Sequence, residues 1–106
     1  KSTALLIYLN DINQGKLLTK ILKEDSFHVI LAENIDQTLI QLRQINFRVL
    51  IFDSDLPGAE QESINATIKS LRSNTLRVET NEDEKMDVVL GKVYEKIKQY
   101  KLNHSQ

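Results

Sequence analysis

The sequence contains no cysteine, a single proline, three glycines and no long apolar segment. Without cysteine, disulfide bonds and thiolate metal sites are excluded, and we expect a reducing, cytoplasmic compartment. No apolar run approaches the roughly 20 residues that a membrane-spanning helix requires, so no membrane contact is expected. The charges nearly balance, with 14 Lys and Arg against 15 Asp and Glu. No overall field attracts nucleic acid, and we expect the chain not to bind it directly.

Short apolar segments alternate with amphipathic ones along the chain. Short, mainly apolar runs are typical of strands buried on both faces of a parallel sheet. We expect strands at 4–9, 27–32, 49–52 and, more briefly, 76–78. Elsewhere apolar residues recur at spacings of three and four, which indicates amphipathic helices. These helices are expected after Asp11, after Asn34, around 64–71 and around 86–100.

Capping residues predict where two of these helices begin. Asn34 followed three residues later by Gln37 resembles a capping box. Thr80 or Asn81 is expected to cap the final helix, because both side chains can accept a bond from an unpaired backbone N–H. The polar tail from Asn103 is expected to be frayed.

Four strands that alternate with four helices imply right-handed crossovers and a mainly parallel sheet with helices on both faces. We therefore expect an α/β, flavodoxin-like doubly wound fold, with residues 1–106 forming a single domain. In such sheets, ligands bind beyond the carboxyl ends of the strands. Side chains that follow the strands are thus the first candidates for a functional site.

Oxygen-bearing side chains follow the first and third predicted strands. Asn10 and Asp11 come after the first strand, and Asp53 and Asp55 come after the third. If these strands are neighbours, the four side chains converge on one rim of the sheet, and Mg²⁺ prefers such oxygen ligands. The alternative is that the acids are solvated or cap the next helix, as Asp11 would cap the first one. The fold pattern alone does not decide between the two.

The segment VLIFDSDLPG, residues 49–58, has an aspartate followed four residues later by a proline. It resembles the phosphoacceptor strand of response-regulator receiver domains in two-component signalling. The preceding residues 27–53 are similar, without a gap, to the second strand, second helix and third strand of the same family. The resemblance extends from the start of the chain to about residue 60. It implies a receiver fold, a domain that is not an enzyme, and Asp53 as the phosphoacceptor.

The resemblance also shows where this chain departs from the family. The family usually carries two acidic residues at the end of the first strand to hold Mg²⁺, and the aligned residues here are Leu9 and Asn10. Asp11 lies one place further on and reaches the metal only if the loop shifts. The backbone carbonyl of Asp55 matches a further family ligand. The resemblance thus implies, at most, a weak Mg²⁺ site of Asn10, Asp11, Asp53 and Asp55.

The second half of the chain lacks part of the family pattern, which places a threonine or serine after the fourth strand and a lysine after the fifth. If 76–78 is the fourth strand, Thr80 is the switch hydroxyl. If 76–78 is the fifth, Glu79 or Thr80 stands where the lysine belongs. A strand at 87–90 followed by Lys92 is another placement, but a helical stripe runs through these residues and disfavours it.

One strand–helix unit is therefore missing between Pro57 and Asn81, either lost by the protein or absent from this continuous numbering. A four-stranded remnant would expose a sheet edge, which partners or loops usually cover.

Three functions follow from these patterns: a phosphorylatable receiver, a pseudo-receiver that works through binding alone, and a flavodoxin-like binder of a small anionic ligand. The last is weakened because there is no glycine-rich phosphate loop. We expect a receiver-like signalling domain of a two-component or phosphorelay regulator, acting as an atypical receiver through protein–protein interaction, with Asp53 as candidate phosphoacceptor. The expected partner is a histidine kinase or another regulatory protein. A homodimer is considered as well, and the final helix is the first surface to inspect for it. Because the chain begins at Lys1, we expect it to be part of a longer regulator.

Overall fold

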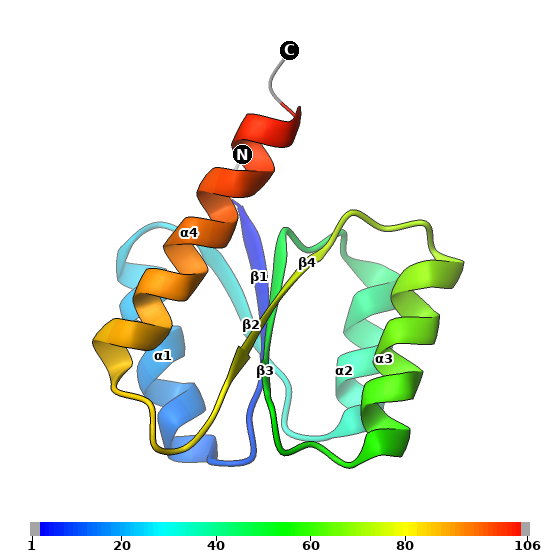
Figure 1. The fold of residues 1–106 in the computed structure, drawn as a ribbon, viewed down its shortest axis with the longest axis horizontal. Helices are drawn as coiled ribbons and strands as arrows, with labels where there is room; N and C mark the ends of the chain where they lie inside the picture. Colours follow the sequence, from blue (N-terminus) through cyan, green and yellow to red (C-terminus); the bar gives the residue numbers. More distant parts are fainter. Residues whose placement is uncertain (1–2, 105–106) are drawn as a thin grey trace.

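The computed structural model describes residues 3–104, and the side chains of residues 3–100. Strands and helices alternate from one end to the other (Figure 1). In chain order they are β1 (Ala4–Tyr8), α1 (Ile12–Glu24), β2 (His28–Leu31), α2 (Ile35–Gln44), β3 (Val49–Asp53), α3 (Gly58–Ser70), β4 (Leu76–Thr80) and α4 (Met86–His104). No helix within these residues is long and apolar enough to cross a lipid bilayer.

The four strands form one parallel sheet in the order β2-β1-β3-β4. Helices α1 and α4 cover one face and α2 and α3 cover the other, as Figure 1 shows with the sheet seen nearly edge-on. This arrangement confirms the expected α/β doubly wound fold. Because successive strand residues point to opposite faces, Leu5 and Ile7 belong to the apolar layer under α1 and α4, whereas Leu6 and Tyr8 belong to the layer under α2 and α3.

Capping side chains fix the starts of the first two helices. Asp11 is the N-cap of α1, and its Oδ1 accepts hydrogen bonds from the backbone N–H groups of Asn13 and Gln14 at 3.0 and 3.3 Å. Asn34 caps α2 by accepting from the backbone N–H of Gln37 at 2.8 Å. The Gln37 side chain reaches back and accepts from the backbone N–H of Glu33 at 2.9 Å, so the cap predicted at Asn34 is confirmed, with the return bond of the box made one residue before the cap.

The predicted cap of the final helix was wrong. Thr80 is still part of β4, where its carbonyl accepts from the backbone N–H of Ser54 at 2.7 Å. Asn81 begins a turn, since its Oδ1 accepts from the backbone N–H of Asp83 at 2.9 Å, and α4 starts only at Met86. The helix extends to His104, so the fraying expected from Asn103 is not found in the described part; residues 105–106 lie outside it.

The second half of the fold is one strand–helix unit shorter than the family pattern. Within residues 3–104 only β4 lies between α3 and α4, and the chain runs without interruption through 81–85 into α4. Residues 87–90 are helical, which excludes the alternative strand before Lys92. The strand β4 is consequently an edge of the sheet.

Candidate functional site

Asp53 lies at the carboxyl end of β3 with β1 on one side and β4 on the other. Thr80 is its partner in the β3–β4 register. The β1–β3 register pairs Tyr8 with Phe52, and continuing it by one residue places Leu9 beside Asp53. Val49 and Ile51, which alternate with Asp53 along β3, belong to the layer under α1 and α4, so Asp53 faces that layer. The site is built around one carboxyl group between Leu9 and Thr80.

The carboxyl group of Asp53 is buried, with 1% of the residue exposed. Its Oδ1 accepts a hydrogen bond from the backbone N–H of Asp55 at 2.9 Å. Its Oδ2 is also buried, and no described group forms a hydrogen bond with it. A buried carboxylate oxygen without a partner is costly unless a cation, a proton or water compensates it. This oxygen is the feature of the rim that most requires an explanation.

Leu9 places an apolar side chain where the family resemblance implies an acidic one. It is 4% exposed and packs within the layer that also contains Ile7 and Ile51. A leucine cannot coordinate a cation, and its burial excludes water from the side of Asp53 that faces β1. Leu9 therefore makes this part of the rim continuous with the hydrophobic core.

The four residues of the predicted Mg²⁺ site are not gathered into a carboxylate cluster. Asn10, Asp11 and Asp55 are exposed while Asp53 is buried, and the Asp11 carboxylate caps α1, as its alternative interpretation predicted. Across residues 3–104, no group of three or more His, Cys, Asp or Glu side chains is arranged to hold a metal ion. Although Asp53 Oδ2 would suit a cation, the surrounding residues do not fit a Mg²⁺ site of the receiver type. The metal role stays a prediction that this arrangement does not favour.

Another carboxylate near the rim is engaged by a tyrosine. Tyr8, at the end of β1, donates its phenol hydrogen to Glu60 Oε1 of α3 at 2.8 Å. Burial, followed by the hydrogen bond to Glu60 and the charge of that group, raises the pKa of Tyr8 to about 12. Tyr8 lies in a predicted strand, and its spacing gives no sign of a polar partner. Its contact with Glu60 joins residues 52 positions apart, which no local pattern could reveal.

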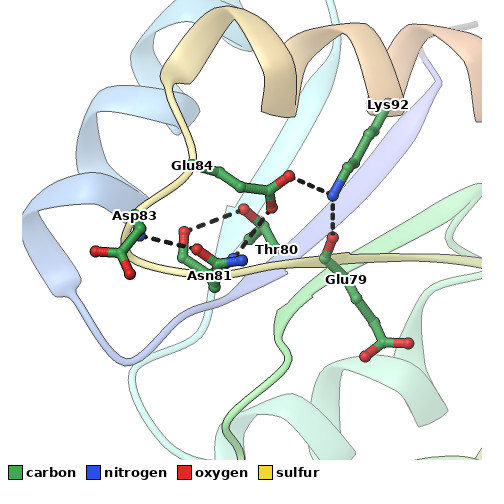
Figure 2. Close-up of polar contacts among 6 residues, drawn as sticks. All are labelled: Glu79, Thr80, Asn81, Asp83, Glu84 and Lys92. Carbon is green, nitrogen blue, oxygen red and sulfur yellow. Dashed lines mark hydrogen bonds and ion pairs between the residues drawn. The ribbon is translucent and has the colours of Figure 1, made fainter.

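A polar network holds the loop of residues 81–85 between β4 and α4 (Figure 2). Glu84 Oε1 accepts from the backbone N–H of Asn81 at 3.2 Å, and Glu84 Oε2 forms an ion pair with Lys92 Nζ at 2.5 Å. Lys92 also donates to the backbone carbonyl of Glu79 at 3.1 Å. The hydroxyl of Thr80 is buried beneath this loop and donates to the carbonyl of Asn81 in a long bond of 3.5 Å.

The network lowers the pKa of Glu84. The hydrogen bond from Lys92 is the largest of several effects that lower the pKa of Glu84, to which the Thr80 side chain and the Asn81 backbone also contribute. The sequence pattern placed Lys92 in a helix and gave it no partner. Its side chain is 43% exposed, yet it connects α4 with β4 and the loop. This could be recognised only once the loop geometry was known.

Comparison with known proteins identifies the fold. No protein-family model matches this sequence, and no curated protein sequence is significantly similar to it. Solved structures nevertheless match almost the whole chain. A CheY-like response regulator receiver domain protein from Methanospirillum hungatei has a TM-score of 0.75 at 16% identity, over 97% of this chain and 99% of that one. The chain has the receiver fold.

Two further receiver domains support this conclusion. A signal receiver domain from Vibrio parahaemolyticus matches with a TM-score of 0.81 at 13% identity, over 97% of this chain and 95% of that one. The response regulator TrrA from Thermotoga maritima, solved in complex with Mg²⁺ and BeF, has a TM-score of 0.62 at 19% identity, over 89% and 98% of the two chains. At these identities the likeness is one of fold. The receiver fold places Asp53 at the rim where the VLIFDSDLPG motif led us to expect it.

Proposed function

We propose that this chain is an atypical receiver, a signalling module of a two-component or phosphorelay regulator that acts through protein–protein interaction without aspartyl phosphorylation. The observation that carries the proposal is the environment of Asp53, which is 1% exposed and lies between Leu9 and Thr80. The expected partner is a histidine kinase or another regulatory protein. The module has no enzymatic role of its own, and we place it in the cytoplasm.

Phosphoryl transfer makes two demands that this site meets poorly. The donor phosphorus must approach a carboxylate oxygen in line, and positive charge must neutralise the transferring oxygens. Here Oδ1 of Asp53 is hydrogen-bonded and Oδ2 is buried, and the described part of the chain has no acidic cluster to bring Mg²⁺ to them. A phosphoryl group would reach Asp53 only after the residues around this carboxylate move apart.

Phosphorylation of Asp53 remains the alternative, and two observations favour it. Oδ2 has no hydrogen-bond partner among the described residues, and Thr80 stands opposite Asp53, where a switch hydroxyl belongs. A small-anion binder has less support. Two cavities among the described residues have volumes of about 360 and 320 Å³; one is lined by residues 42–46 and 71–74 and the other by residues of β4 and α4, and Asp53 lines neither of them.

Intact-mass spectrometry after incubation with Mg²⁺ and acetyl phosphate tests the proposal directly. We expect no phosphoryl adduct on the folded chain, whereas a receiver with an intact acidic pair, treated in parallel, should be modified. Asp53→Asn and Asp55→Asn serve as matched variants. An adduct that is lost in Asp53→Asn but kept in Asp55→Asn would overturn the proposal and establish Asp53 as a working phosphoacceptor.

A further inference from the structure

The outer edge of β4 carries backbone groups that face away from the sheet. The backbone N–H of Leu76 donates to Arg48 at 3.0 Å, and the carbonyl of Thr80 accepts from Ser54 at 2.7 Å, so both groups point toward β3. In a parallel ladder, alternate residues bond to the same neighbour. Arg77 and Glu79 therefore direct their N–H and C=O groups outward. No strand within residues 3–104 lies beyond them.

This edge is open to solvent and carries charges of both signs. The side chains of Arg77 and Glu79 are exposed, and α4 packs against one face of the strand. A groove of about 320 Å³ runs beside the edge and is lined by Arg77, Val78, Glu79, Lys92, Glu95, Lys96 and Gln99. Of the outward groups, the carbonyl of Glu79 accepts from Lys92. An edge of this kind is a ready template for another strand.

We propose that β4 pairs with β4 of a second copy of this chain, antiparallel and centred on Val78, which joins two four-stranded sheets into one of eight strands. In this register Arg77 lies opposite Glu79 of the second copy, and Glu79 lies opposite its Arg77. Residues with outward backbone groups then face each other and exchange both hydrogen bonds, four in all for the two pairs. The two-fold axis makes the contact self-complementary, as a closed dimer requires.

The charges select this register over its neighbours. An antiparallel pairing centred on Arg77 would place two arginines opposite each other, and one centred on Glu79 would place two glutamates opposite each other. Like charges directly opposite are destabilising, whereas opposite charges stabilise a cross-strand pair. Of these three registers, the one centred on Val78 places opposite charges together in both cross-strand pairs. The hydrogen bond from Lys92 to the carbonyl of Glu79 can persist in the dimer, because a backbone carbonyl has two lone pairs and accepts a second bond.

The strand has five residues, so the contact is smaller than the interfaces of stable dimers and the association is expected to be weak and reversible. The inference deepens the proposed function by identifying a second copy as one partner. The pairing of β4 strands rests on the proposed function only in the claim that association of two copies carries a signal. The acetyl phosphate assay depends on Asp53, so either proposal can fail without the other.

Sedimentation equilibrium of the 106-residue chain from about 10 μM to about 1 mM tests the pairing at concentrations where weak complexes form. Arg77→Glu and Glu79→Arg each place like charges in both cross-strand pairs, so each alone should weaken association at least tenfold. Mixing the two variants restores opposite charges in both pairs and should restore the dimer. The exchanged double variant, Arg77→Glu with Glu79→Arg, should associate like the wild type. Lys20→Glu on α1 is the charge-reversal control, and circular dichroism verifies that every variant is folded.

Amide hydrogen exchange provides a second readout that does not depend on side-chain charge. The N–H groups of Arg77 and Glu79 should exchange more slowly as the wild-type concentration rises, while the N–H of Leu76, already bonded to β3, should not change. A wild type that stays monomeric throughout the range would overturn the proposal. Single variants that dimerise as well as the wild type would also overturn it and would direct attention to the outer face of α4. A mixture of the two single variants that does not restore association would overturn it too.

Discussion

The side chain of Asp53 has one oxygen, Oδ2, that is buried and forms no hydrogen bond with any described group. Its other oxygen is held by the backbone of Asp55. In a site rich in carboxylates, a cation would compensate such an oxygen, but here Leu9 occupies the neighbouring position and is itself part of the core. Leucine at this position offers no ligand to a cation and lowers the polarity around the carboxylate.

We expect Asp53→Asn to raise the free energy of unfolding by roughly 1 to 2 kcal/mol, because the amide keeps the shape and the bond from Asp55 but carries no buried charge. Urea denaturation at pH 7 in the presence of EDTA measures the difference. Asp55→Asn, at an exposed position, should change stability by less than about 0.5 kcal/mol. A clear loss of stability in Asp53→Asn would instead mean that the carboxylate is compensated in solution.

At the scale of elements, the contact between β4 and α4 depends on the loop of residues 81–85. Glu84 in this loop bonds to Lys92 of α4, which lowers the pKa of the glutamate below its ordinary value of 4.5. A carboxyl group with a lowered pKa in the folded state stabilises the protein above its unfolded pKa. That stabilisation is lost as the pH falls through the folded pKa. The ion pair should therefore matter at neutral pH and disappear in acid.

Glu84→Gln should lower the free energy of unfolding at pH 7 by less than about 1 kcal/mol, since Lys92 is substantially exposed and solvent screens the pair. The difference from the wild type should shrink as the pH falls below 4.5 and vanish once Glu84 is protonated in the folded state. Denaturation curves between pH 7 and pH 3 test this. Glu82→Gln, at an exposed position of the same loop, should show no such trend. A constant difference at all pH values would indicate lost packing.

Most elements and the position of Asp53 could be predicted from the sequence, because runs such as Val49–Phe52 and the apolar stripes depend on local spacing alone. The start of α4 could not be predicted. Asn81 can cap a helix or begin a turn with equal chemical ease, and the bond between Glu84 and Lys92, which forms only in three dimensions, accompanies the turn. The partners of Lys92 were missed for the same reason.

At the scale of the whole molecule, the fold is complete without a fifth strand. Two helices cover each face of a four-stranded sheet, and α4 packs on the same layer as α1. Ile51 is buried on the face under α1 and α4 and Leu50 on the face under α2 and α3, so β3 is covered on both faces even though β4 is the last strand. What the shorter fold leaves exposed is the outer edge of β4, not its apolar core. This edge, unlike the covered core, is open to contact with a partner.

The docking of α4 should determine whether this shortened fold unfolds as one unit. Val93 is completely buried under the sheet, whereas Val88, on the same helix, is 46% exposed. Val93→Ala should lower the free energy of unfolding by about 2 kcal/mol through lost burial and a small cavity. Val88→Ala should leave it unchanged or raise it by about 0.5 kcal/mol, because alanine favours the helix.

Far-UV circular dichroism and tyrosine fluorescence in urea, at low protein concentration, should report one common midpoint for each variant. Separate midpoints in Val93→Ala would mean that α4 detaches before the sheet unfolds, and that the four strands with α1, α2 and α3 form a stable unit by themselves.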